Sequence, residues 1–346
     1  MNTTSLSNGS SKPMFTQDQC QNGPIPDGDE QQAMFQAFCR CNILPHPLLV
    51  EEIFSKFFLT VSVMGNLLVI IVLYRMKRGF FNAPMKALLQ NLSIADTAVC
   101  VLYNVNDAVG VGSPLTTSGF CKLFGGLLWA SLSSSSCAVC CVSIERYLAV
   151  VKPLEFNLTK KKALLMIIFS WYYSLLFTIL DFYFLEKIVY KVCLRGDVAI
   201  CGYSHLPDID VTVLNLLNII ATFIIPLIIV LYTNVSIMAV MVKSAKAKKK
   251  NTTDQSNKHS GVIMIVFLLT AIYVICSVPF TVNYVLNAIP VVIDVPRQFT
   301  AVAYYLMLAN SSCNPFIYSF FSAEFRRECA NLISLPYNWI KDKING

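Results

Sequence analysis

The sequence predicts an all-α membrane protein, a seven-transmembrane helix bundle followed by an amphipathic helix on the membrane surface. Of the 346 residues, 55% are apolar and only 14% are charged, and the apolar residues gather in long runs. A soluble domain of this length would carry about 25% charged residues. Seven runs reach the roughly 20 residues that an α-helix needs to cross a hydrocarbon core. They cover residues 53–74, 84–109, 119–150, 163–185, 207–240, 260–289 and 298–320.

The chain divides into three parts around these spans. Residues 1–50 are polar and rich in Asn, Ser, Gln, Gly and Pro, which predicts a loop-like tail without a cleavable signal peptide. Residues 51–320 form the seven-transmembrane domain. In residues 321–346, apolar side chains repeat at helical spacing opposite charged ones, which predicts an amphipathic helix on the membrane followed by a short tail. The apolar residues are Phe321, Phe325, Cys329, Leu332 and Ile333.

The basic residues are distributed unequally over the connections, and this asymmetry predicts the orientation of the chain. With the N-terminus outside, only eight of the 27 Lys and Arg residues lie in outer segments. The others cluster on the cytoplasmic side, for example at residues 75–78, 160–162 and 243–250. We therefore expect a multi-pass plasma-membrane protein with an extracellular, glycosylated N-terminus, whose sequons begin at Asn2 and Asn8. We expect contacts with membrane lipids and none with nucleic acid.

Six cysteines lie outside in this topology, and an even number in an oxidising compartment indicates up to three disulfides. These cysteines are Cys20, Cys39, Cys41, Cys121, Cys193 and Cys201. Two β-prone runs after the fourth span, residues 188–193 and 198–201, predict a hairpin with its turn at Gly196–Asp197.

A carboxylate lies in the middle of the second span, where an ionisable group is costly and usually serves a function. Spans one, three and seven offer oxygen-bearing side chains at similar depth, which is the ligand set that a small hard cation needs. We therefore expect a sodium site, and the alternative is a polar cluster that only packs the helices. The site residues are Asp96, Ser135, Asn310, Ser311 and Asn314, with Asn66 nearby.

The inner end of the third span carries adjacent opposite charges, Glu145 and Arg146, which can pair at rest and separate when a partner offers a better contact. Prolines in spans five, six and seven permit kinks, because each removes one backbone hydrogen bond. In order and spacing, these motifs resemble those of the rhodopsin-like G-protein-coupled receptors over residues 50–333. The motifs are Gly65-Asn66, Leu92-Ser-Ile-Ala-Asp96, Cys121, Glu145-Arg146-Tyr147, Trp171, Pro226, Cys276-Ser-Val-Pro279 and Asn314-Pro-Phe-Ile-Tyr318.

The resemblance implies a receptor in which an extracellular ligand stabilises an outward tilt of span six and opens a cleft for a heterotrimeric G protein. The coupling residues would be Glu145, Arg146, Tyr147, Leu154 and Tyr318. It also implies a disulfide from Cys121 to the hairpin. We expect Cys201 as the partner, because a bridge on the second strand pins the loop over the pocket. By family position, the ligand would meet Leu128, Trp129, Leu132, Asn218, Phe280, Tyr284 and Tyr304, with Asp107 and Asp181 as charge partners.

The sequence speaks against several classes of ligand and of function. Leu128 stands where the amine receptors of this family carry an aspartate, and span seven has no lysine to bind retinal. A net negative outer face favours a cationic peptide. A channel or transporter would show repeats or charged residues along a path. The three histidines, His46, His205 and His259, lie in different segments, so we expect no enzyme.

Three residues depart from the family pattern. Ser277 replaces a tryptophan in span six, Asn234 replaces a tyrosine in span five, and Tyr273 replaces a phenylalanine. Because the lost indole and the lost tyrosine belong to the usual activation relay, a non-signalling scavenger or a heteromer partner is the alternative function.

Overall fold

A computed structural model describes residues 49–76, 81–110, 115–154, 158–192, 196–203, 208–247, 255–288, 295–332 and 334. Five of the predicted spans are single helices: α3 (Leu49–Arg75), α4 (Ala83–Gly110), α7 (Lys160–Phe184), α10 (Gln255–Ala288) and α11 (Arg297–Phe321). The third span comprises α5 (Ser118–Phe120), η1 (Cys121–Gly125) and α6 (Gly126–Val151). The fifth comprises α8 (Asp208–Ile219), η2 (Ile220–Ile224) and α9 (Ile225–Ala247). Asn2, Asn8, Cys20, Cys39, Cys41 and Cys193 lie outside the described residues.

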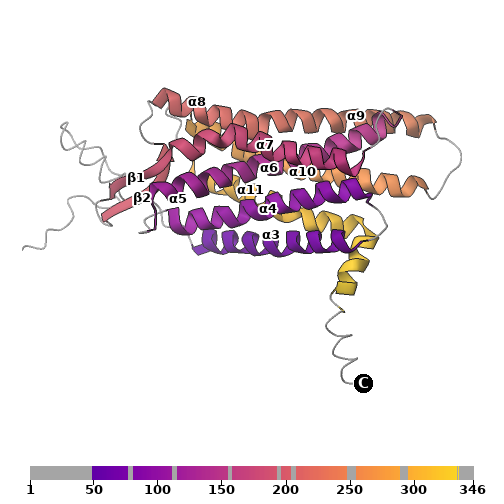
Figure 1. Ribbon diagram of the computed structural model, residues 1–346, viewed down its shortest axis with the longest axis horizontal. Helices are drawn as coiled ribbons and strands as arrows, with labels where there is room; N and C mark the ends of the chain where they lie inside the picture. The colour runs from indigo at the N-terminus through magenta and orange to yellow at the C-terminus, as the bar shows by residue number, and fades with distance from the viewer. Residues whose placement is uncertain are drawn as a thin grey trace, which may run out of the picture.

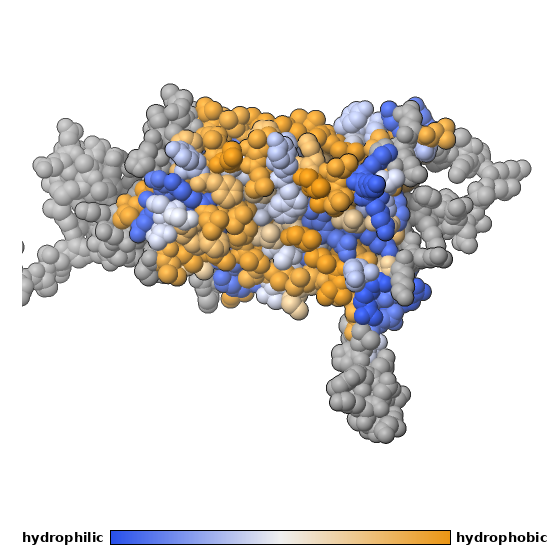
Figure 2. Space-filling model, in the orientation of Figure 1, coloured by the Kyte–Doolittle hydropathy of each residue, from blue (hydrophilic) through white to orange (hydrophobic). Residues whose placement is uncertain are grey.

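These segments form one bundle of alternating direction, with the β-hairpin at one end, here called the hairpin end (Figure 1). The opposite end is called the Arg146 end. The visible face of the bundle is mostly apolar along its middle, and hydrophilic side chains gather toward both ends (Figure 2). Lipid tails require this pattern because they cannot solvate polar groups.

Among the described helices, six are long and apolar enough to cross a membrane. The remaining predicted span, α11, is less apolar because it carries Asn310, Ser311, Ser312 and Asn314. Its packing shows why those residues are tolerated, since Ser311, Ser312 and Asn314 are buried inside the bundle. We therefore place α11 as the seventh helix of the bundle.

Side chains cap several helices at their first turn and so define where they begin. The Thr159 hydroxyl accepts from Lys162 N at the start of α7, and Asn82 Oδ1 accepts from Met85 N at 2.8 Å at the start of α4. The Ser322 hydroxyl accepts from Phe325 N at 3.1 Å and begins a helix over residues 323–332. This last helix runs away from the axis of the bundle at the Arg146 end, as expected for a surface helix (Figure 1).

The C-terminal helix is anchored by Phe325, which is fully buried against the ring of Tyr318. Cys329 and Leu332 pack partly against the same core, as their spacing predicts. The prediction that Phe321 belongs to this face is wrong, since Phe321 is the last residue of α11 and 43% exposed. The reason is that Ser322 breaks the helical path and starts a new helix.

Glycine permits one close helix contact at the centre of the bundle. A Cβ atom on Gly65 of α3 would lie only 2.7 Å from the Pro315 ring of α11. Because Gly65 has no side chain, the Pro315 ring fits directly against the α3 backbone, at the position where α11 lacks a backbone hydrogen bond.

Two π-helical turns widen the third and fifth spans. In η2, hydroxyl groups from neighbouring helices reach the backbone carbonyls: Tyr173 of α7 donates to Ala221 O at 2.9 Å, and Tyr273 of α10 donates to Phe223 O at 3.5 Å. A π turn and the following Pro226 disturb the regular bonding of the helix, so such donors replace partners that the backbone loses.

The hairpin pairs β1 (Leu185–Val192) with β2 (Gly196–Tyr203) in antiparallel register, with Lys187 opposite Cys201. The predicted turn at Gly196–Asp197 is therefore wrong, because both residues pair within β2, with Val192 and Lys191. The hairpin is longer than the β-prone runs alone indicated. The predicted Cys121–Cys201 disulfide is confirmed, with 5.3 Å between the Cα atoms.

Candidate functional site

The carboxylate of Asp96 is fully buried and joins helices α4, α6 and α11. Its Oδ1 accepts from Ser135 at 2.6 Å and from Ser311 at 3.1 Å, and its Oδ2 accepts from the Asn314 amide. Asn66 donates to Ser311 O at 2.8 Å and extends the network to α3. The structure thus brings most of the predicted cation-site residues into one polar cluster.

Asn310 makes none of the described hydrogen bonds to this carboxylate. It lines a cavity of about 20 Å³ beside the cluster, together with Ser135 and Ser311. A space of this size holds one water molecule or one small ion. The donor set fits sodium, because Asp96 supplies charge and the neighbouring hydroxyls keep free lone pairs on their oxygens.

Toward the hairpin end, six of the predicted ligand residues meet in one apolar cluster. Phe280 is its centre: the ring centroids of Tyr304, Tyr284 and Phe223 lie 5.3, 6.0 and 5.4 Å from it. Trp129 contacts Tyr284 edge-to-face at 5.1 Å. Such pairs add about 0.5–1.5 kcal/mol each beyond the area they bury. The six predicted members are Leu128, Trp129, Leu132, Phe280, Tyr284 and Tyr304.

The two predicted charge partners lie in different surroundings. Asp107 is exposed near the end of α4, whereas Asp181 on α7 is buried. Asp181 accepts hydrogen bonds from the Asn218 amide at 3.0 and 3.1 Å and from the Tyr203 hydroxyl of β2. Burial raises the pKa of Tyr203, so its hydroxyl stays protonated and remains a donor.

Asp181, Asn218 and Tyr203 therefore tie the hairpin to α7 and α8. All the described partners of this carboxylate are neutral, although a buried carboxylate is best stabilised by a cation. Tyr203 is a residue that the sequence prediction missed. It follows Cys201 by two positions on one strand, so both side chains lie on the same face of the hairpin.

Other residues at the hairpin end were also missed by the sequence prediction. Tyr284 donates to Asn215 of α8 at 2.9 Å, and Thr300 of α11 donates to Asn283 of α10 at 2.8 Å. These bonds connect α10 to both of its neighbours beside the aromatic cluster.

At the opposite end of the bundle, Glu145 and Arg146 are buried and form a two-point ion pair. Tyr147 lies beside them with its ring 6.0 Å from Tyr232. Leu154 is fully exposed just beyond α6, where another protein can reach it. Tyr318 is buried between Phe81 and Phe325, and its hydroxyl has no hydrogen-bond partner within the described part of the chain.

The three residues that differ from the family pattern, Asn234, Ser277 and Tyr273, are all buried. Asn234 on α9 donates to Thr270 on α10 at 2.9 Å. Ser277 donates to Tyr273 O at 2.6 Å, one turn back along α10. Asn234 thus bridges two helices, while the hydrogen bond that Ser277 donates among the described residues stays within its own helix.

Comparison with known proteins agrees with this architecture. The sequence profile of the family described as "7 transmembrane receptor (rhodopsin family)" matches residues 65–318. The Tachykinin-like peptides receptor 99D of Drosophila melanogaster is 25% identical over 280 residues, which cover 76% of this chain and 52% of that receptor, about half its length. The human Thyrotropin-releasing hormone receptor is 24% identical over 303 residues, 77% of this chain and 73% of the receptor. G-protein coupled receptor 52 of Mus musculus is 26% identical over 296 residues, 78% and 76% of the two chains.

Proposed function

Because the chain belongs to the rhodopsin family of seven-transmembrane receptors, we propose that it binds an extracellular peptide with a cationic group and activates a heterotrimeric G protein. The hairpin end faces outward and the Arg146 end faces the cytoplasm of the cell, since the basic residues cluster at the latter. The observation that carries the proposal is the buried carboxylate of Asp181 beside the aromatic cluster, under a hairpin held by the Cys121–Cys201 disulfide.

Peptide recognition is supported by the chemistry of the hairpin end. Aromatic rings and a few fixed polar groups are typical of ligand sites. The carboxylate of Asp181 has neutral donors only among its described partners, so an ammonium or guanidinium group could improve its pairing. Two of the relatives are named as receptors for tachykinin-like peptides and for thyrotropin-releasing hormone, which also favours a peptide.

Coupling to a G protein would begin at Arg146. Its guanidinium is paired with the neighbouring Glu145 and can exchange this contact for one with the partner. Leu154 is the exposed apolar contact, and the ring of Tyr318 is the buried group that can change position. We propose that the ligand stabilises a tilt of α10 that frees these groups, since a ligand shifts such an equilibrium only through its differential affinity for the two states.

The polar cluster would hold a sodium ion through the oxygens of Asp96, Ser135, Ser311, Asn310 and Asn314. When bound, the ion supplies a positive charge that balances the buried carboxylate. The chain's own residues orient that carboxylate by hydrogen bonds from two helices, α6 and α11, and so link it to the seventh helix, which also carries Tyr318.

One observation favours the second candidate, a scavenger or heteromer partner that does not signal. The Asn234–Thr270 hydrogen bond joins α9 to α10 at a position where the family resemblance implies a tyrosine, and it opposes separation of these two helices. A single bond of this kind contributes only about 0.5–1.5 kcal/mol, so it weakens activation without preventing it.

The experiment uses cells that express the full chain together with a panel of G-protein activation reporters. Tachykinin-like peptides, thyrotropin-releasing hormone and a library of amidated cationic peptides serve as probes. The receptor proposal predicts a saturable response that the Arg146→Ala variant loses while it still binds the active peptide at the cell surface. Saturable peptide binding with no G-protein response would instead establish the scavenger function.

A further inference from the structure

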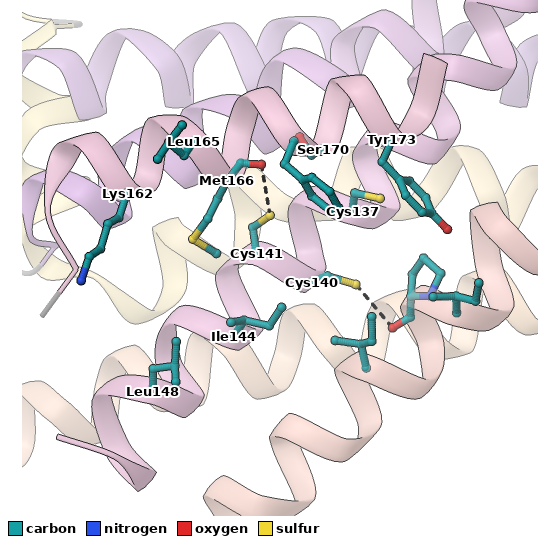
Figure 3. Close-up of a pocket in the computed structure, with 14 residues that line it drawn as sticks. Cys137, Cys140, Cys141, Ile144, Leu148, Lys162, Leu165, Met166, Ser170 and Tyr173 are labelled. Atoms are coloured by element: carbon teal, nitrogen blue, oxygen red, sulfur yellow. Dashed lines mark hydrogen bonds between the residues drawn. The ribbon is translucent and has the colours of Figure 1, made fainter. Parts of the chain in front are cut away.

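The lipid-facing surface carries an apolar groove between α6, α7 and α9, in the half of the bundle toward the Arg146 end (Figure 3). Its volume is about 490 Å³. Cys137, Ile144 and Leu148 of α6 form one wall, and Met166 and Phe169 of α7 form another. This groove is separate from both the aromatic cluster and the Asp96 cluster.

Four of the polar side chains that line the groove already form hydrogen bonds inside the protein. Tyr173 donates to Ala221 O at 2.9 Å and Ser170 donates to Ile167 O at 2.8 Å. The thiols of Cys140 and Cys141 point to the carbonyls of Pro226 and Met166, at 3.4 and 3.8 Å. These bonds occupy the donor hydrogens of the four side chains. A polar guest would lose its own hydrogen bonds to water here, whereas a hydrocarbon chain would lose none.

The position and length of the groove match one leaflet of a bilayer. Leu165 and Phe169 at its edge are 64% and 63% exposed on the surface that faces lipid. Lys162 and Tyr173 mark its two ends along α7 and are separated by about 16 Å at the rise of a helix. Half of a hydrocarbon core is about 15 Å thick.

The end of the groove toward the Arg146 end carries a positive charge. Lys162 lines this end, and Figure 3 shows its ammonium group beyond the apolar side chains. Lys160 and Lys161 are exposed beside it at the start of α7. Anionic lipids of the cytoplasmic leaflet are attracted by about 1 kcal/mol per basic residue near the surface.

We propose that an anionic phospholipid of the inner leaflet binds this groove, with one acyl chain along the α6 and α7 walls and its headgroup on Lys162. The inference rests on the proposed orientation and does not depend on ligand or G protein. Ile144 and Leu148 flank Arg146 on α6, so the bound chain contacts the helix that carries the proposed coupling residue.

The test uses the full chain in phosphatidylcholine vesicles that contain a small fraction of phosphatidylserine with a photoactivatable acyl chain. After illumination, we expect labelled peptides from residues 137–148 and 162–173. Excess unlabelled phosphatidylserine should compete, and phosphatidylcholine should not. Labelling spread over all lipid-facing helices, or equal labelling by a phosphatidylcholine probe, would overturn the proposal.

Paired variants separate a site from general attraction to the leaflet. Lys162→Gln should lower the labelling about fivefold, while Lys161→Gln, in the same basic run, should change it little. Cys137→Phe fills the groove and should abolish labelling. Leu164→Phe is the matched control, because it adds a ring on the exposed side of α7 away from the groove. If Cys137→Phe does not fold, the two lysine variants still test the proposal. An equal loss of labelling in Lys162→Gln and Lys161→Gln would contradict a defined site. An N-terminal epitope tested on intact cells checks the orientation independently.

Discussion

The amide of Asn234 on α9 donates a hydrogen bond of 2.9 Å to the hydroxyl of Thr270 on α10, and both side chains are buried. The same amide also donates to Val230 O at 2.8 Å, so it keeps a partner if Thr270 is changed. This bond therefore links α9 to α10, while the second amide hydrogen of Asn234 bonds within its own helix.

We expect Thr270→Val to raise agonist-independent G-protein activation, because it removes the link between the two helices and preserves side-chain volume. A hydrogen bond of about 0.5–1.5 kcal/mol corresponds to an increase of roughly two- to twelvefold. The measurement is basal activation per receptor at the cell surface. Thr281→Val is the matched control, since the described hydrogen bond of Thr281 goes to Ser277 O within α10. Unchanged basal activity would show that this bond does not restrain the helix.

Loss of the Tyr203 hydroxyl, which donates a hydrogen bond to the buried carboxylate of Asp181, should destabilise the protein. Tyr203→Phe deletes the hydroxyl that bonds Asp181 and should lower the free energy of unfolding by about 1.5–3 kcal/mol, as for hydrogen bonds to charged groups. Thermal unfolding of the purified receptor measures the loss. Tyr183→Phe is the control because Tyr183 is 70% exposed. The loss should shrink in an Asp181→Asn background, and full additivity of the two changes would argue against direct coupling.

The sodium proposal predicts a salt-specific stabilisation. Sodium chloride, compared with choline chloride at equal ionic strength, should raise the thermal stability of the wild-type receptor by about 1 kcal/mol when sodium is several times its Kd. Asp96→Asn should remove this increment, since the amide can still accept from Ser135 and Ser311 but carries no charge. Asp181→Asn should retain it. A sodium effect that persists in Asp96→Asn would place the ion elsewhere.

The contact between Gly65 and Pro315 predicts a position that tolerates no side chain. Gly65→Ala places a Cβ 2.7 Å from the Pro315 ring and should cost about 1–3 kcal/mol of stability, because α3 and α11 must separate. Gly119→Ala is the matched control, since its nearest neighbour would lie 4.0 Å away. Equal melting temperatures for the two variants would contradict this packing.

Much of the fold was predictable, because the hydrocarbon core sets the length of each span independently of how the helices pack. The buried polar cluster followed from the same principle: Asp96 needs partners, and Ser135, Ser311 and Asn314 lie at similar depth on other spans. Contacts of the hairpin were less predictable, because they depend on the strand register. Tyr203 meets Asp181 only through that register, and neither hydropathy nor helical spacing reports it.

The sequence also does not predict the break at Ser322, which makes Phe321 the last residue of α11 rather than part of the surface helix. Apolar spacing continues smoothly across this point, so periodicity alone assigns Phe321 to the surface helix. The side-chain cap of Ser322 on Phe325 N ends that continuity. The aromatic cluster was predicted by family position rather than by physical reasoning, and its hydrogen-bonded neighbours Asn215 and Asn283 had no counterpart in that argument.

The π-helical turn η2 affects how ligand-binding residues can be assigned by alignment with relatives. Each residue of an α-helix turns the chain by about 100°, and a π turn holds one residue more than the regular repeat. Positions counted back from Pro226 across Ile220–Ile224 therefore point about 100° away from the direction they would have in an uninterrupted helix. In a relative whose helix is regular here, the equivalents of Asn218 and Asn215 are shifted by one place in the alignment, so the ligand specificity of this segment has to be compared by spatial position.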